Sequence, residues 1–162
     1  MPDLELVVPT AEDMRKLGRE LAGVVAAGDL VLLTGDLGAG KTTLTQGIGD
    51  GLGVRGTIAS PTFVIARVHR SAAGGPPLVH VDAYRLGGWD ELEDLDLEAS
   101  LDDAVTVVEW GTGIAEGLAD RRLEIEIVRT HGGEPGEGSE DRMVRVRAIR
   151  RDLPRLASAV AE

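Results

Sequence analysis

The sequence contains no cysteine among its 162 residues. Disulfide bonds and thiolate metal sites are therefore excluded. No apolar run approaches the roughly 20 residues that a membrane-spanning helix needs. The amino-terminal stretch MPDLELVVPT is acidic and does not have the basic-then-apolar layout of a signal peptide. We therefore expect a cytoplasmic protein with no membrane partner.

Positive charge is also scarce. The formal net charge is −11, which argues against tight, sequence-independent binding to DNA or RNA. Of the 17 basic residues, only Lys16 and Lys41 are lysines. The hydrophobic content of 43% and the charged content of 28% are typical of a globular chain. A chain of this length can bury one substantial core, so we predict a single domain over residues 1–162.

A glycine-rich loop follows the short apolar run Leu30–Leu33, which is typical of a buried strand. The loop fits the pattern G-x-x-x-x-G-K-[ST], and the residues after it can continue as a helix. Backbone N–H groups in such a loop, together with the helix dipole, form an anion site. The predicted nucleotide-binding residues here are Gly35, Asp36, Leu37, Gly38, Ala39, Gly40, Lys41, Thr42 and Thr43.

Lys41 is expected to reach the β- and γ-phosphates, and the Thr42 hydroxyl to bind Mg²⁺. The guanine-reading motif of GTPases has Asn or Thr, then Lys, then Asp two residues on. The chain has no asparagine and no such triplet. ATP is therefore the better nucleotide candidate.

The predicted fold is α/β, a P-loop NTPase-like single domain with a mixed, largely parallel central sheet flanked by helices and a carboxy-terminal β-hairpin. Thr10 is the predicted N-cap of a helix that runs through Ala27, and Gly51 and Gly53 are predicted to end the second helix. The predicted strands are 4–8, 29–34, 63–69, 78–82, 104–109, 123–129 and 143–147, and the predicted helices after the first are 41–52 and 152–160. Antiparallel pairing is expected for 63–69 with 78–82 and for 123–129 with 143–147.

Two apolar strands end in a carboxylate, LVHVD at Asp82 and VTVVE at Glu109. Ligands of open α/β sheets bind beyond the carboxyl ends of strands, so either acid could reach a metal ion at the phosphate loop. Thr62 lies between the loop and the Asp82 strand and could contact the γ-phosphate as a switch residue. Alternatively, these acids form surface ion pairs and Thr62 belongs to a proline turn.

Residues 89–98, WDELEDLDLE, interleave leucines and a tryptophan with acids. Such a stretch is most often a solvated face, although it also suits docking to a basic partner protein.

Four motifs follow one another along the chain: GDLGAGKTTL (35–44), SPTF (60–63), HVDAYRL (80–86) and VEWG (108–111). In this order they resemble the TsaE family (older name YjeE), small bacterial ATPases needed to make threonylcarbamoyladenosine in tRNA. The phosphate loop is common to many families, whereas the three later motifs are far more specific.

The resemblance implies binding of ATP or ADP with Mg²⁺ and weak hydrolysis of ATP by the protein alone. It also implies two partners, the threonylcarbamoyl-transferase subunit TsaD and its inactive paralogue TsaB. Their complex modifies adenosine 37 of tRNA, so tRNA is reached indirectly.

Carried over by position, Lys41 and Thr42 would bind phosphate and Mg²⁺, and Glu109 would be the acidic metal ligand. Asp82 would assist the metal or the attacking water, and Thr62 would act as the switch residue. Thr10 and Arg129 would lie near the adenine.

Two other functions remain open from the residues alone. A small-molecule or nucleotide kinase uses the same loop, but it usually carries an arginine-rich lid and an acceptor pocket. A non-catalytic module would bind ATP without turnover, which the strand-end acids argue against.

Overall fold

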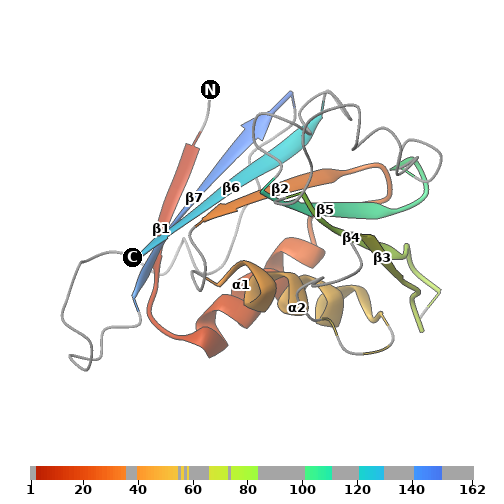
Figure 1. Ribbon diagram of the computed structural model, residues 1–162, viewed down its shortest axis with the longest axis horizontal. Helices are drawn as coiled ribbons and strands as arrows, with labels where there is room; N and C mark the ends of the chain where they lie inside the picture. Colours follow the sequence, from red (N-terminus) through yellow and green to blue (C-terminus); the bar gives the residue numbers. More distant parts are fainter. Residues whose placement is uncertain are drawn as a thin grey trace.

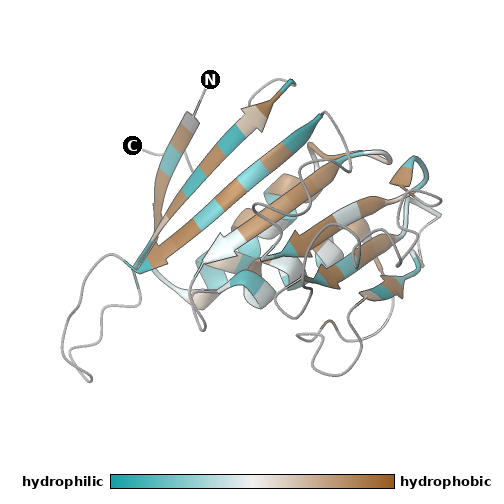
Figure 2. Cartoon of the chain, turned by 45° about the horizontal axis from the view of Figure 1, so that its top comes forward, coloured by the Kyte–Doolittle hydropathy of each residue, from teal (hydrophilic) through white to brown (hydrophobic). Residues whose placement is uncertain are grey.

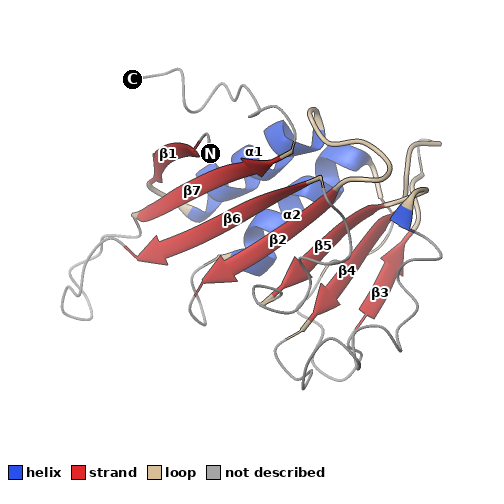
Figure 3. Ribbon diagram, turned by 90° about the horizontal axis from the view of Figure 1, so that it is seen from above, coloured by secondary structure: helices blue, strands red, loops and turns tan. Residues whose placement is uncertain are grey.

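The computed structural model describes residues 3–35, 40–54, 56, 58, 66–72, 74–83, 101–110, 121–129 and 141–150. In this part of the chain, one twisted sheet carries two helices on one of its faces (Figures 1 and 3). The helices are α1 (Ala11–Ala22) and α2 (Lys41–Leu52). The strands are β1 (Asp3–Val8), β2 (Leu30–Gly35), β3 (Ala66–His69), β4 (Leu78–Asp82), β5 (Val105–Glu109), β6 (Arg122–Arg129) and β7 (Arg142–Ile149).

The sheet has the strand order β1-β7-β6-β2-β5-β4-β3. Its centre is parallel, because β2 pairs with both β5 and β6, and β5 pairs with β4. Both sides are antiparallel, through β3 with β4 and through β6 with β7 and β1. The predicted mixed sheet and its two antiparallel pairs are therefore confirmed.

The main core lies between the helices and the sheet. It contains the apolar face of α1, including Leu17 and Leu21, and the α2 side chains Leu44 and Ile48. A second apolar cluster lies on the opposite face of the sheet, over β2, β4 and β5. Strands β2 and β5 are therefore buried on both faces, as central parallel strands are.

The long strands β6 and β7 differ from these central strands because they alternate in polarity (Figure 2). Their apolar residues join the core beneath the helices, and their charged residues lie on the other face. There, Arg145 donates to Glu5 of β1 over 2.7 Å and lies 4.0 Å from Glu126 of β6. Period-two alternation in these segments of the sequence thus indicates which face of the sheet the helices cover.

The first helix ends earlier than predicted. Thr10 is its N-cap, as predicted, but α1 ends at Ala22 rather than at Ala27. The chain then turns, with the Asp29 carboxylate accepting from the Ala26 N–H over 2.9 Å. Val25 remains buried after the turn, which explains why its spacing resembles a continuing helix.

The second helix has the predicted bounds, but only one of the two glycines ends it. Gly53 has a φ of 70° and is the C-cap. Gly51 lies inside the last turn, where an added Cβ would be 2.4 Å from the Ala22 Cβ. It is a packing glycine, not a terminator.

Neither described helix is long and apolar enough to cross a membrane. The predicted terminal helix 152–160 and residues 63–65 of the predicted third strand lie outside the described residues, as does the acidic stretch 89–98.

Helices α1 and α2 approach each other at backbone distance. A Cβ added at Gly47 of α2 would lie 2.2 Å from the Arg15 carbonyl oxygen, and one added at Gly18 of α1 would lie 2.4 Å from the Leu44 carbonyl oxygen. Both clashes involve main-chain atoms, which cannot move aside as a flexible side chain can. Glycine at these positions is therefore required for the two helices to cross here.

Gly47→Ala is expected to lower the free energy of unfolding by about 3 kcal/mol, because the added methyl forces the helices apart. The matched control is Gly23→Ala. Gly23 has a φ of −75°, and its nearest heavy atom would be 3.4 Å from an added Cβ. Urea unfolding followed by circular dichroism measures both variants. Equal stability of the two variants would contradict the proposed close approach.

Candidate functional site

The site is built around the step from β2 to α2. Strand β2 ends at Gly35, and α2 begins at Lys41 after the N-cap Gly40. Gly40 has a φ of 115°, a conformation that favours glycine. A Cβ there would also lie 3.3 Å from the Met14 Cε of α1. The amino end of α2, whose first N–H groups have no acceptor within a helix, is thus fixed by glycine geometry and by α1.

Lys41 lies inward at this helix end, with 5% of its surface exposed. Its Nζ donates to the Gly35 carbonyl oxygen over 2.5 Å. The same Nζ lies 4.3 Å from the centroid of the Trp110 ring, a cation–π distance. The ammonium group is therefore held between the end of β2 and the residue that follows β5.

The strand-end acids lie on the two strands that follow β2 in the sheet order, β5 and β4. Glu109 is the register partner of Leu33 on one side and of Asp82 on the other. Register partners in a parallel sheet point to the same face, so the two carboxylates share the face that the helices cover. Glu109 is only 3% exposed.

The Glu109 carboxylate has a buried partner. Nε2 of His80, a fully buried residue of β4, is hydrogen-bonded to Glu109 Oε2. The backbone around Glu109 is held as well, since its carbonyl accepts from the Ala83 N–H over 2.8 Å. The next N–H, that of Trp110, donates to the Leu33 carbonyl over 2.9 Å. Trp110 itself has a φ of 63°, in the left-handed region.

The donors at this edge are suited to a hard cation. A Thr42 hydroxyl in the first turn of α2 and a Glu109 carboxylate are oxygen ligands of the kind that Mg²⁺ takes, with water and phosphate oxygens completing the shell. Within the described residues there is no group of three or more His, Asp or Glu that could hold a metal without such help. The oxygen donors Thr42 and Glu109 are thus of the type that would suit Mg²⁺.

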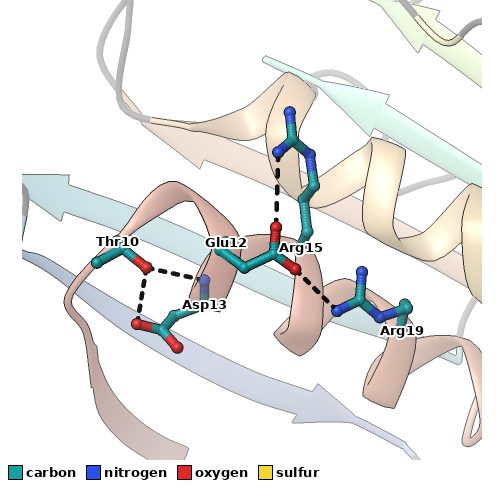
Figure 4. Close-up of polar contacts among 5 residues, drawn as sticks. All are labelled: Thr10, Glu12, Asp13, Arg15 and Arg19. Atoms are coloured by element: carbon teal, nitrogen blue, oxygen red, sulfur yellow. Dashed lines mark hydrogen bonds and ion pairs between the residues drawn. The ribbon is translucent and has the colours of Figure 1, made fainter.

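Thr10 is the N-cap of α1, one turn before Met14, whose side chain lies against Gly40. Its hydroxyl donates to Asp13 Oδ2 over 2.8 Å and accepts from the Asp13 N–H over 3.1 Å (Figure 4). In the same helix, Glu12 bridges Arg15 and Arg19 on the surface. The predicted contact of Thr10 with adenine stays a prediction.

The structure places Lys41 beside Gly35 through their hydrogen bond, and Asp82 beside Glu109 at neighbouring strand ends. Gly40, Thr42 and Thr43 lie with Lys41 at the start of α2. Arg129 is at the end of β6, opposite Arg142 of β7. The remaining predicted residues, Asp36, Leu37, Gly38, Ala39 and Thr62, lie outside the described residues.

Sequence reasoning assigned no role to Trp110, Met14 or His80, although all three belong to the site. The spacing of His80 and Asp82 in one strand places them on the same face, which was a usable signal. No pattern in the sequence indicates that Trp110 turns back over Lys41.

Comparison with known proteins identifies the family. The model of the family "Threonylcarbamoyl adenosine biosynthesis protein TsaE" matches residues 8–135. A Streptomyces coelicolor protein named tRNA threonylcarbamoyladenosine biosynthesis protein TsaE is 65% identical over 125 residues, which is 76% of this chain and 84% of the relative. A Bacillus subtilis protein of the same name is 38% identical over 135 residues, 83% of each chain.

Among solved structures, the crystal structure of Bacillus subtilis YdiB superposes with a TM-score of 0.70 and 32% identity. The alignment covers 91% of this chain and 86% of YdiB. Sequence and fold agree across most of the molecule, and the chain belongs to the TsaE family.

Proposed function

We propose that this chain binds and hydrolyses ATP as a subunit required for threonylcarbamoyladenosine modification of tRNA. The pathway follows from the family and from the names of its relatives. The observation that carries the ATPase part is the position of Lys41, at the start of α2, over the ring of Trp110, the residue that follows Glu109 at the end of β5.

The phosphates of ATP or ADP would lie at the amino end of α2. Its N–H groups and the positive end of its dipole stabilise an anion there. Lys41 would leave the Gly35 carbonyl and the Trp110 ring to contact the β- and γ-phosphates. Thr43, in the same turn, would help hold the α-phosphate.

Thr42 and Glu109 would hold Mg²⁺. When bound, the ion would neutralise charge on the phosphates and hold them in line for displacement. Glu109 suits this role because its strand is fixed on both sides by backbone hydrogen bonds. Asp82, in register beside it, would orient the attacking water, and Thr62 would contact the γ-phosphate in the triphosphate state.

The protein alone would turn ATP over slowly, because phosphoryl transfer without a supplied arginine is slow in many P-loop proteins. We infer that two proteins, the transferase subunit TsaD and its paralogue TsaB, raise the rate, and that hydrolysis resets their complex between rounds. The tRNA would be contacted by the complex. This tRNA modification would take place in the cytoplasm.

Phosphate release from ATP measures this proposal directly. We expect slow, Mg²⁺-dependent release by the purified chain and a rate raised at least about tenfold by TsaD and TsaB together, equivalent to about 1.4 kcal/mol off the barrier. Bovine serum albumin at equal mass is the control for nonspecific effects. A rate that the partners leave unchanged would contradict partner activation, and release that requires an added small-molecule acceptor would identify a kinase.

Lys41→Ala is expected to weaken ATP and ADP binding at least about 100-fold, because it removes the cation beside the phosphates. Isothermal titration calorimetry measures the affinity. The chain offers a matched control in Lys16→Ala, which removes the other lysine from an exposed position on α1. Nucleotide affinity that is undiminished in Lys41→Ala would refute the phosphate site.

Glu109→Gln is expected to spare ADP binding in EDTA and to lower Mg²⁺-dependent hydrolysis about 100-fold or more, because a neutral amide is a poor ligand for Mg²⁺. Asp82→Asn is the comparison variant, which tests the water-orienting role at the neighbouring strand end. Unchanged turnover in Glu109→Gln together with lost turnover in Asp82→Asn would transfer the metal role to Asp82.

A further inference from the structure

His80 is completely buried on β4, yet it makes a polar contact with an acid of the neighbouring strand. Its Nε2 is hydrogen-bonded to Glu109 Oε2, and both side chains lie on the face of the sheet that the helices cover. On β4, His80 comes two residues before Asp82. Asp82 is the register partner of Glu109 on the parallel strand β5. The imidazole therefore reaches the carboxylate across the two neighbouring strands, on the face of the sheet that the helices cover.

The direction of this hydrogen bond follows from chemistry. A carboxylate accepts hydrogen bonds, so Nε2 carries the proton and donates it. The other ring nitrogen, Nδ1, is buried without a hydrogen-bond partner among the described residues. If this histidine only filled the core, we would expect both of its ring nitrogens to be hydrogen-bonded, or an apolar residue in its place. Among the described residues, the hydrogen bond that this side chain makes is the one to Glu109.

The same hydrogen bond distinguishes the two oxygens of the Glu109 carboxylate. Within the described part of the chain, Oε2 accepts from His80, and no hydrogen bond is made to Oε1. The Glu109 backbone is already held by Ala83 and by the hydrogen bond that follows at Trp110. The Glu109 side chain could still rotate about its single bonds, and the hydrogen bond to His80 prevents that rotation. Oε1 is then the oxygen left to bind a cation.

We propose that His80 is a positioning residue that holds the Glu109 carboxylate in the orientation that binds the divalent cation of the nucleotide complex. This inference rests on the proposed function, since it takes Glu109 as a ligand of Mg²⁺. His80 contacts neither nucleotide nor cation. It acts through Glu109, as the partners of metal ligands do in other sites.

The variants that test this separate the hydrogen bond from the volume of the ring. His80→Gln places an amide N–H near the position of Nε2, and His80→Phe keeps a ring with no donor. His80→Met is a second apolar variant with a flexible side chain, for use if the phenylalanine variant does not fold. Glu109→Gln, alone and combined with each apolar variant, reports on the ligand itself.

The probe is Mn²⁺, whose free concentration is followed by electron paramagnetic resonance in the presence of the protein and saturating ADP. We expect the apolar variants to raise the Kd of Mn²⁺ for the protein–ADP complex about 10- to 100-fold. His80→Gln should bind Mn²⁺ close to the unsubstituted protein. ADP affinity in EDTA, measured by calorimetry, should be the same in all these variants, because the phosphate contacts are untouched.

The outcomes separate the two proposals. If Glu109→Gln leaves Mn²⁺ affinity unchanged, Glu109 is not the metal ligand and the proposed function fails at that residue. If Glu109→Gln weakens Mn²⁺ binding but the apolar His80 variants do not, the positioning role of His80 is wrong. It is also wrong if His80→Gln fails to restore binding, if ADP affinity in EDTA falls equally, or if an apolar His80 substitution weakens Mn²⁺ binding further in the Glu109→Gln background.

Discussion

The close crossing of α1 and α2 is the constraint on which the site depends. Gly18 and Gly47 let the two backbones approach to a distance that any side chain would prevent. The crossing holds α2 over the sheet and brings Met14 of α1 against Gly40, the residue before Lys41. A helix placed a few ångströms farther out would carry its amino end, and Lys41 with it, away from Trp110 at the end of β5.

The sheet provides the other half of the arrangement. Because β2, β5 and β4 are parallel neighbours, the end of β2 at Gly35 and the acids that end β4 and β5 lie at one edge of the sheet. Burial on both faces makes these strands rigid, and the backbone hydrogen bonds at Glu109 and Trp110 extend that rigidity to the residues at the edge. The backbone at this edge of the sheet is therefore fixed, and side-chain rotation is the movement left to its residues.

Much of this could be predicted from the sequence because its signals are local. The bounds of α2, the apolar strands ending at Asp82 and Glu109, and the antiparallel pairing at both sides of the sheet follow from periodicity and turn residues. Features that depend on contacts between distant segments could not be predicted. Val25 has helical spacing, but it lies in the turn after α1 and is buried there. Gly51 packs against Ala22 of the other helix. Trp110 reaches Lys41 only because β5 lies next to β2.

The pairing of β1 with β7 joins the first and last described strands. During synthesis β1 leaves the ribosome long before β7 exists, and β7 must itself wait to pair with β6. The elements β2, α2, β4 and β5 are complete earlier in the chain. The nascent protein can therefore assemble this half of the sheet first, while β1, with Leu6 and Val8 still uncovered, remains an unpaired edge and the part most exposed to aggregation.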